Sequence, residues 1–316
     1  MRILANDGIS QNGVTALEKA GFEVLTTTVA QEQLANFIKD NKVDALLVRS
    51  ATKVRKELID ACPGLKLIGR GGVGMDNIDV DYAKSKGLHV INTPAASSDS
   101  VAELVFAHLY GGIRFLYDAN RNMPLEGDSN FEGLKKSYSK GMELRGKTMG
   151  IFGFGKIGQA TARLAIGAGM KILYCDPEVE ESQIGLSFYD GQEVTFNLKS
   201  SDKDQVLQQA DYISLHIPEQ QNYVLGKSEF SKMKKGVGII NAARGGVLDE
   251  VALVAALEDG TVSFAGLDVF ESEPQPEIKI LMHPNISLSP HIGAATLEAQ
   301  ERIGLELADQ IVSLLK

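Results

Sequence analysis

The sequence predicts an α/β protein with two doubly wound parallel-sheet domains, and three features carry that prediction. Short apolar runs alternate with helical patterns over residues 1–97, and they do so again over residues 149–288. Such alternation is typical of βαβ units, in which helices cover both faces of a parallel sheet. A glycine-rich turn, GFGKIG at 153–158, joins an apolar run to a helical pattern at the start of the second series. The length of 316 residues is enough for about two domains.

Each predicted element follows from local periodicity. In the first series, strands are expected where apolar residues cluster, at Ile3–Ala5, Glu23–Thr26, Ala45–Val48, Leu65–Ile68 and His89–Ile91. Helices are expected between them, near residues 11–20, 31–40, 54–61 and 79–86. The second series predicts strands at 149–152, 172–174, 212–215, 237–240, 264–267 and 286–288. A last helix is expected to carry its apolar side chains on one side, at Ile303, Leu307, Ile311 and Leu314.

The segment between the two series is predicted to be a long helix followed by a loop. Apolar residues recur at three- and four-residue spacing from Val101 to Leu116. His108 falls on that stripe, where a packed and hydrogen-bonded histidine is more common than a ligand. Residues 121–141 are polar and contain glycine, which is typical of a loop that crosses from one domain to the next.

The GFGKIG turn has the surroundings that dinucleotide binding requires. Gly153 permits the tight turn out of a strand, Gly155 lets the backbone approach a pyrophosphate, and Gly158 lets the helix lie close on the sheet. The helix start offers unpaired N–H groups to the phosphates. The helix is expected to end at Gly169 and to bury the face formed by Ile157, Ala160, Leu164 and Ala168.

An acidic residue follows this helix at the position that selects the cofactor. Asp176 lies 18 residues beyond Gly158 (176 − 158), at the end of the next apolar run. A carboxylate there accepts hydrogen bonds from the ribose hydroxyls and repels a 2′-phosphate. We therefore expect a Rossmann domain that binds NAD rather than NADP. The alternative is a structural glycine turn in an unrelated α/β protein.

Composition excludes several other classes of partner. The net charge is −9 and basic residues form no cluster, which argues against nucleic acid and anionic membranes as partners. No apolar run is long enough to span a bilayer, and the N-terminus lacks the apolar region of a signal peptide. Cys62 and Cys175 show no metal-binding spacing. We expect a cytoplasmic protein without a metal.

Three residues at successive strand ends predict hydride-transfer chemistry. Arg244 lies in NAARGG at 241–246, Glu273 in LDVFESEP at 267–274, and His291 in SPHIGAAT at 289–296. Arginine suits a substrate carboxylate because its planar group donates two parallel hydrogen bonds. Histidine exchanges a proton with a carbonyl or hydroxyl oxygen near neutral pH, and an adjacent carboxylate orients it. Each residue is ambiguous alone, and a surface salt bridge is the alternative for Arg244.

The first series contains two stretches that resemble substrate contacts. VRSATK at 48–53 places Arg49 and Ser50 at a strand end, and GRGGVG at 69–74 places Arg70 before a run of glycines. Such a turn exposes backbone N–H groups to an anion, and Arg49 and Lys53 add positive charge for a second acidic group. The alternative, a glycine-rich loop beside solvated cations, stays open for Arg70. Of the other histidines, His216 is expected beside the adenine pocket.

The motifs together resemble those of the D-2-hydroxyacid dehydrogenases over essentially the whole chain. The matching strings are VRSATK, GRGGVGMDNID, NTP, SVAE, GFGKIG, HIP, NAARGGVLDE, GLDVFESEP and SPHIGAAT. The resemblance implies that His291 is the acid–base, that Glu273 is its partner, and that Arg244 holds the substrate carboxylate. It implies that Asp268 contacts the nicotinamide carboxamide.

The resemblance also implies binding residues and a domain arrangement. Cofactor contacts are expected at Gly153, Gly155, Lys156, Ile157, Gly158, Asp176, His216, Ile217, Pro218, Ala242, Ala243, Arg244, Asp268, His291, Gly293 and Ala294. Contacts with a phosphorylated 2-hydroxy acid are expected at Arg49, Ser50, Arg70, Gly72, Val73, Arg114 and Arg244. Residues 1–97 and 292–316 would form a flavodoxin-like substrate (lid) domain, and residues 98–291 the NAD-binding domain. Relatives are homodimers joined through their NAD-binding domains.

Two alternatives stay open at this point. The substrate can be an unphosphorylated 2-keto acid such as glyoxylate or hydroxypyruvate, because such enzymes share the catalytic trio. Some proteins of this fold instead act as NAD-sensing corepressors that bind peptides. The chain also ends at Lys316, so the C-terminal domains with which some relatives sense serine are not expected.

Overall fold

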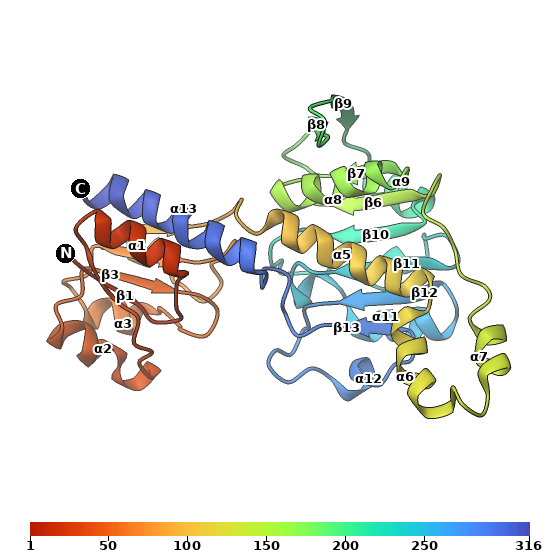
Figure 1. The fold of residues 1–316 in the computed structure, drawn as a ribbon, viewed down its shortest axis with the longest axis horizontal. Coiled ribbons are helices and arrows are strands. Elements are labelled where there is room, and N and C mark those ends of the chain that lie inside the picture. Colours follow the sequence, from red (N-terminus) through yellow and green to blue (C-terminus); the bar gives the residue numbers. More distant parts are fainter. The chain divides into compact units, whose positions relative to one another are not determined.

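A computed structural model describes residues 1–316, and the chain divides into two compact units (Figure 1). Unit 1 comprises Met1–Ser100 with Ala294–Lys316, and unit 2 comprises Val101–Gly293. Each unit contains one parallel sheet covered by helices on both faces, so the predicted fold class is confirmed. No helix in either unit is long and apolar enough to cross a membrane.

Unit 1 has a five-stranded sheet in the order β2-β1-β3-β4-β5, which is the strand order of flavodoxin-like folds. The strands are β1 Arg2–Ala5, β2 Glu23–Leu25, β3 Ala45–Val48, β4 Leu67–Arg70 and β5 His89–Asn92. The helices are α1 Gln11–Lys19, α2 Gln31–Asp40, α3 Lys56–Ala61, α4 Val80–Ser85 and α13 Leu297–Leu315. The fourth strand begins two residues later than predicted and ends on Arg70, beside Val48 of β3.

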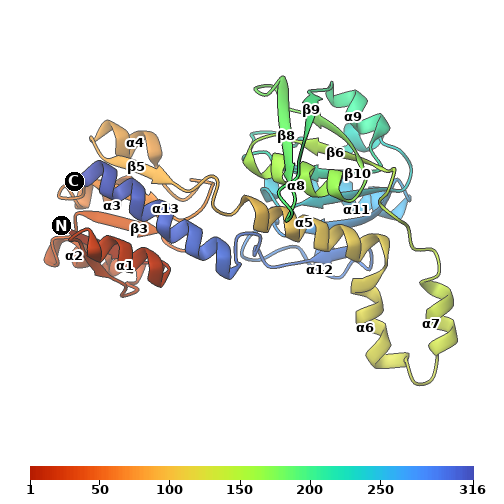
Figure 2. The ribbon, with the colours of Figure 1, turned by 45° about the horizontal axis from the view of Figure 1, so that its top comes forward.

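The last helix of the chain belongs to the sheet of unit 1. Helices α1 and α13 lie side by side on one face (Figures 1 and 2), and α2, α3 and α4 cover the other. The two helices approach closely because glycines meet where they cross: a Cβ on Gly13 would lie 2.8 Å from the carbonyl oxygen of Gly304. Ile303, Leu307 and Ile311 are buried as predicted, but Leu314, near the free end, is 40% exposed.

Unit 2 has a six-stranded sheet in the order β13-β12-β11-β10-β6-β7. Its strands are β6 Thr148–Phe152, β7 Lys171–Cys175, β10 Tyr212–Leu215, β11 Val237–Asn241, β12 Val262–Leu267 and β13 Ile286–Leu288. The helices that cover this sheet are α5 Ser98–Ile113, α8 Lys156–Gly167, α9 Lys203–Gln209 and α11 Glu250–Glu258, together with the shorter α10 Lys227–Phe230, α12 Ile278–Leu281 and the 3₁₀ turn Gly245–Val247. Helices α5 and α8 cover one face, and α9 to α12 cover the other.

The prediction of a loop over residues 121–141 was wrong. Helix α6 spans Leu116–Glu126 and α7 spans Phe131–Ser137, and both belong to unit 2 rather than crossing between domains. This pair of helices projects from the rest of the unit (Figure 2). The helical pattern was hidden because α6 buries no side chain, so it shows no apolar stripe, and because it contains Pro124.

Two further predictions about unit 2 need correction. Strands β8 Glu181–Ser187 and β9 Glu193–Lys199 form an antiparallel hairpin where no element was predicted. The helix after the glycine turn is also rotated from its predicted orientation: Leu164 is 37% exposed, whereas Gly158, Ala160, Thr161, Ala162 and Ala165 are buried. Small residues face the sheet because the glycine turn brings the helix close to it. Gly169, with φ +77°, ends the helix as predicted.

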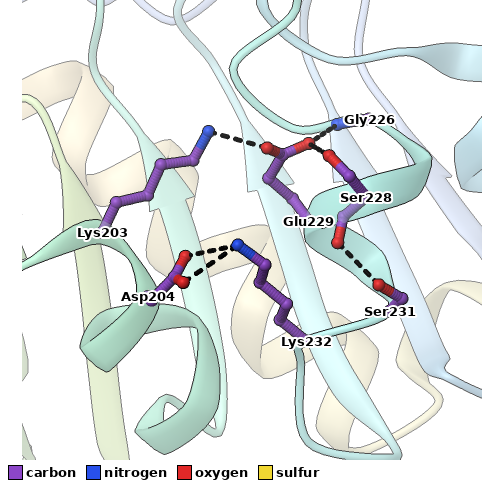
Figure 3. A network of polar contacts seen from close by, with 7 residues as sticks. All are labelled: Lys203, Asp204, Gly226, Ser228, Glu229, Ser231 and Lys232. Carbon is purple, nitrogen blue, oxygen red and sulfur yellow. Dashed lines mark hydrogen bonds and ion pairs between the residues drawn. The ribbon is translucent and has the colours of Figure 1, made fainter.

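A partly buried ion pair joins α9 to α10 (Figure 3) and links stability to pH. Glu229 accepts hydrogen bonds from Lys203 Nζ at 3.0 Å, from Ser228 Oγ at 2.8 Å and from Gly226 N at 3.0 Å. Burial opposes ionisation of Glu229, but these donors outweigh burial and lower its pKa from 4.5 to about 2. A lowered pKa stabilises the fold fully above pH 4.5, and the contribution is lost as the pH falls from 4.5 to about 2.

We therefore expect Glu229→Gln to lower the free energy of unfolding at pH 7 by about 2 kcal/mol, with the partial exposure of Lys203 taken into account. The difference from wild type should disappear as the pH approaches 2, measured by urea unfolding across pH. The neighbouring pair Asp204–Lys232 (Figure 3) is more exposed. Asp204→Asn should therefore cost less than about 0.5 kcal/mol. A constant deficit for Glu229→Gln at every pH would contradict the linkage.

Candidate active site

The dinucleotide turn lies where the strand order of unit 2 reverses, between β6 and β10. Gly153 has φ +86°, and a Cβ there would lie 2.4 Å from the carbonyl oxygen of His216. A Cβ on Gly158 would lie 2.2 Å from the carbonyl oxygen of Gly153. These two glycines are therefore required by the fold itself. Gly155 differs, because a Cβ there would meet no atom within 4 Å.

The open space above Gly155 fits a pyrophosphate. Gly155 is the N-cap of α8, and no side chain caps this helix, so its first N–H groups remain available to an anion. Asp176 lies at the end of β7 and accepts hydrogen bonds from Phe154 N in the glycine turn and from Glu178 N. Lys156 is exposed and Ile157 is partly buried at the helix start. These residues fit NAD, which supplies the hydride acceptor when bound.

The three predicted catalytic residues lie at the carboxyl ends of three neighbouring strands. Arg244 follows β11, Glu273 follows β12 and His291 follows β13. His291 Nδ1 lies 2.8 Å from Glu273 Oε2, and both side chains are partly exposed. A carboxylate can only accept, so the proton lies on Nδ1 and the lone pair of the neutral ring lies on Nε2. That nitrogen is suited to take a proton from a substrate hydroxyl.

Side-chain hydrogen bonds fix the shape of the Arg244 loop, and this loop packs closely on the segment that leads to Glu273. Arg244 Nη1 donates to the carbonyl oxygen of Ala243, and Asn241 Nδ2 donates to the carbonyl oxygen of Arg244 at 2.8 Å. A Cβ on Gly245 would lie 2.0 Å from the carbonyl oxygen of Phe270, so only glycine allows this approach. The exposed Glu273 is fixed by a bond from Phe270 N to its Oε1 at 3.0 Å.

A pair of glutamates that was not predicted from the sequence also joins the segment after Arg244 to the segment before Glu273. Glu250 N donates to Glu271 Oε1 at 3.0 Å, and Glu271 N donates to Glu250 Oε1 at 2.9 Å. Glu250 is 5% exposed, and burial raises the pKa of its carboxyl. The glutamates of VLDE and VFESEP are apparent in the sequence. Their reciprocal pairing, however, depends on contacts between segments about 20 residues apart, which periodicity does not reveal.

Asp268, which the resemblance places against the nicotinamide carboxamide, directly follows β12. Its side chain is 1% exposed and accepts hydrogen bonds from Ser289 Oγ at 2.6 Å, Ile292 N at 2.8 Å and Gly293 N at 2.8 Å. The carboxylate is thus directed into the loop that carries His291. In this structure its bonds hold that loop, and the contact with the nicotinamide carboxamide stays a prediction.

His291 itself has a backbone conformation that needs such support. Its φ is +54°, in the left-handed region, which costs a non-glycine residue about 1–2 kcal/mol. His291 N donates to the carbonyl oxygens of Asp268 and Ser289, at 2.8 and 3.1 Å. Bonds on both sides of the residue therefore maintain the conformation that directs its ring to Glu273.

His216, expected beside the adenine pocket, has a buried side chain, and its contact with the cofactor stays a prediction. Its Nε2 lies 2.9 Å from Ser214 Oγ and 3.1 Å from Thr161 Oγ1, beneath helix α8. Burial lowers the pKa of His216 to about 3, so the ring is neutral. The part of this residue beside the glycine turn is its carbonyl group. Ile217 and the exposed Pro218 follow it at the end of β10.

The predicted substrate residues of unit 1 gather at the carboxyl edge of its sheet. Arg49 directly follows β3, and Arg70 is the last residue of the neighbouring strand β4. Asp7 accepts from Arg49 N at 2.6 Å, and Asn77 donates to the carbonyl oxygen of Arg49 at 2.7 Å and accepts from Arg70 Nε at 3.1 Å. The Arg49 side chain donates to Gln300. Ser50 and Val73 are exposed beside them.

Glycine is required beneath one of these arginines. Gly72 has φ +155°, and a Cβ there would lie 2.5 Å from Arg70 Nη1. Burial lowers the pKa of the Arg49 guanidinium, and Asp7 opposes that effect. Arginine still stays charged throughout the physiological range. Unit 1 therefore presents two fixed positive charges on adjacent strand ends, and it also contains Ala294, which the sequence analysis assigned to cofactor binding.

Arg114, expected among the substrate contacts, does not lie near Arg244, Glu273 and His291 in the same chain. Helix α5 runs antiparallel to the strands: Val101 lies beside Gly293 at their carboxyl end, and Gly112 lies beside Phe264 near the start of β12. Arg114 follows the far end of this helix, where its stem packs on Gly141. Within one chain it lies at the sheet edge opposite to His291.

Unit 2 has a Rossmann-type sheet, a glycine turn before a helix without a side-chain cap, and a histidine–glutamate pair at neighbouring strand ends. This is the arrangement of an NAD-dependent dehydrogenase. The comparison with known families agrees: residues 106–293 match the NAD-binding domain of D-isomer specific 2-hydroxyacid dehydrogenases. The chain belongs to the D-isomer specific 2-hydroxyacid dehydrogenase family, and it is an NAD-dependent enzyme of that family.

Similar proteins act on more than one substrate. A hydroxypyruvate reductase of Thermotoga maritima is 40% identical, over 98% of this chain and 97% of that protein. A D-3-phosphoglycerate dehydrogenase of Methanocaldococcus jannaschii is 39% identical over 100% of this chain, which spans only 58% of that protein's length. The crystal structure of a glyoxylate reductase from Paecilomyes thermophila has a TM-score of 0.80 and 31% identity, covering 98% of this chain and 94% of that one.

Proposed function

We propose that the chain oxidises 3-phospho-D-glycerate to 3-phosphohydroxypyruvate with NAD, the first step of serine biosynthesis, in the manner of a D-3-phosphoglycerate dehydrogenase. The observation that carries the proposal is the pair of arginines, Arg49 and Arg70, on adjacent strand ends of unit 1. Arginine binds phosphate through parallel hydrogen bonds. Arg244 can hold the substrate carboxylate, and the positive charges of Arg49 and Arg70 suit a second acidic group such as a phosphate ester.

The proposed roles in unit 2 follow from the bonds already described. His291 Nε2 takes the hydroxyl proton of the substrate as the hydride leaves C2, and Glu273 stabilises the imidazolium that forms. Arg244 holds the substrate carboxylate beside the same strand ends. In the reverse direction, His291 returns the proton to the carbonyl oxygen. The charge on the imidazolium is thus offset by a carboxylate 2.8 Å away.

The phosphate assignment is tested by comparing two substrates on two proteins. Wild type should reduce NAD with 3-phospho-D-glycerate far faster than with D-glycerate, measured as kcat/KM from NADH absorbance. Arg49→Ala should lower that preference by about 10- to 100-fold, because a hydrogen bond to a charged group contributes about 1.5–3 kcal/mol. Arg55→Ala is the matched control, since Arg55 pairs with Asp79 in the same region and should leave the preference unchanged. Similar rates on both substrates would overturn the assignment.

Reduction of hydroxypyruvate or glyoxylate is the second candidate function. It is favoured by the Thermotoga maritima hydroxypyruvate reductase, whose length this chain matches almost completely. The NADH-driven reductase assay decides between the two: higher kcat/KM for either unphosphorylated keto acid than for 3-phosphohydroxypyruvate would favour this candidate. Absence of turnover with every 2-keto acid would instead favour the NAD-sensing binding protein considered from the sequence.

We further propose that the chain forms a homodimer through its NAD-binding domain, with helices α6 and α7 in the interface. The support is exposed apolar surface on these helices: Leu116, Met123, Leu125 and Phe131 are 63%, 42%, 75% and 55% exposed. Leu125→Glu with Phe131→Glu should convert a dimer to a monomer in light scattering. Ile278→Glu, at an equally exposed apolar residue on α12, should stay dimeric. A monomeric wild type would contradict the proposal.

A further inference from the structure

His108 is a buried histidine with a hydrogen bond at each ring nitrogen. It lies on α5 and is 5% exposed. Its Nδ1 lies 2.8 Å from Ser287 Oγ and its Nε2 lies 2.9 Å from Ser289 Oγ. Gly266 of β12 makes room for it, since a Cβ there would lie 2.6 Å from His108 Cβ. The histidine thus connects α5 to Ser287 on β13 and to Ser289 just beyond this strand. Ser289 begins the loop that carries His291.

The chemistry of the neighbours determines the direction of each hydrogen bond. Ser289 Oγ lies 2.6 Å from Asp268 Oδ1, and a carboxylate only accepts, so Ser289 donates its single proton there. Ser289 Oγ must then accept from His108, which places the ring proton on Nε2. Burial lowers the pKa of His108, so Nδ1 keeps its lone pair and accepts from Ser287. The neighbours therefore select one tautomer of the ring.

From Asp268 the chain of hydrogen bonds continues to both sides of His291. The carboxylate accepts from Ile292 N and Gly293 N, each at 2.8 Å. The carbonyl oxygens of Asp268 and Ser289 accept from His291 N. His291 is in the left-handed region, with φ +54°. Its conformation therefore depends on the orientation of Asp268, and the Ser289 hydroxyl is the only side chain that donates to that carboxylate among the bonds described.

We propose that His108 is a positioning residue for the acid–base histidine. Through Ser289 it fixes the hydrogen bonding of Asp268, which holds residues 291–293 so that His291 Nδ1 reaches Glu273. The proposal rests on the proposed role of His291. Nothing in it requires His108 to touch substrate or cofactor, because the contact passes through Ser289 and Asp268.

The two serines provide a matched pair of variants. Ser289→Ala and Ser287→Ala each remove one hydroxyl bonded to the same histidine, but only Ser289 connects to Asp268. We expect both to lower Tm by similar amounts. Ser289→Ala should lower kcat about tenfold with KM for NAD unchanged, because a catalytic group held slightly out of place loses rate rather than cofactor affinity. Ser287→Ala should keep the wild-type kcat. Equal losses of kcat in the two variants would overturn the proposal.

Variants of His108 test whether it acts through Ser289 and Asp268. His108→Leu removes the donor to Ser289, and His108→Gln retains an amide N–H at a similar distance along the side chain. We expect kcat to fall in His108→Leu and to be largely restored in His108→Gln. In a double-mutant cycle, His108→Leu should have no further effect on kcat when Ser289 is already alanine. Additive effects would show that His108 acts by another path and would contradict the proposal.

Hydrogen exchange gives a readout that does not need turnover. In deuterium exchange followed by mass spectrometry, a peptide covering residues 289–294 should exchange faster in Ser289→Ala and His108→Leu than in wild type and Ser287→Ala. Unchanged exchange in His108→Leu would overturn the positioning role. If wild type turns over no 2-hydroxy acid, the proposed function fails, and the exchange comparison still decides whether His108 holds this loop.

Discussion

His291→Ala is expected to lower kcat about 1,000-fold while leaving the Kd for NAD within about twofold of wild type. The loss follows from the geometry: His291 Nε2 is the nitrogen available to a substrate hydroxyl, because Nδ1 is bonded to Glu273. Without that nitrogen, the hydroxyl proton must pass to water as the hydride leaves. The glycine turn and Asp176 lie on other strand ends, so NAD binding should be preserved.

Two further variants make this result specific. Glu273→Gln keeps a hydrogen-bond acceptor for Nδ1 but removes the charge, so it should reduce kcat less than His291→Ala does. His283→Ala is the control: its Nδ1 accepts from Asn285 N in a turn before β13, and kcat should stay at the wild-type value. Equal losses of rate and NAD affinity in His291→Ala would count against the acid–base role.

Gly155→Ala is expected to weaken NAD binding about 10- to 100-fold without lowering Tm. Its φ of −68° and ψ of −163° suit alanine, and a Cβ meets no protein atom within 4 Å. The added methyl group would instead occupy the space over the helix start that a pyrophosphate needs. Losing one hydrogen bond between the phosphate and a backbone N–H accounts for a change of this size. Titration calorimetry with NAD and a thermal melt measure the two quantities.

Glycines of the same helix separate ligand effects from folding effects. Gly158→Ala should lower both Tm and NAD affinity, because its Cβ would lie 2.2 Å from the carbonyl oxygen of Gly153. Gly167→Ala, in open space at the other end of α8, should raise Tm slightly and leave NAD affinity unchanged. A large drop in Tm for Gly155→Ala would show that this glycine is needed by the fold rather than by the cofactor.

Local patterns in the sequence predicted the fold class and most of the strands, because a buried strand is recognisable from its own residues. Strands buried on both faces appear as uninterrupted apolar runs, and β3 and β10 lie where those runs predicted them. The left-handed glycines of the turn and helix end, Gly153 and Gly169, were identified because few other residues adopt those angles. The helices α6 and α7 were missed because side chains that pack on no core leave no periodic pattern.

The sequence by itself determined the class of chemistry, because Arg244, Glu273 and His291 each follow a strand, and strand ends of a parallel sheet share one edge. Only the tertiary structure decided what each polar side chain does there. It directs Asp268 into the His291 loop and His216 beneath α8, and it places Arg114 at the opposite edge from His291. It also joins His108 to Ser289 across 181 residues of chain. A hydrogen bond depends on position and direction in space, which spacing along a sequence does not specify.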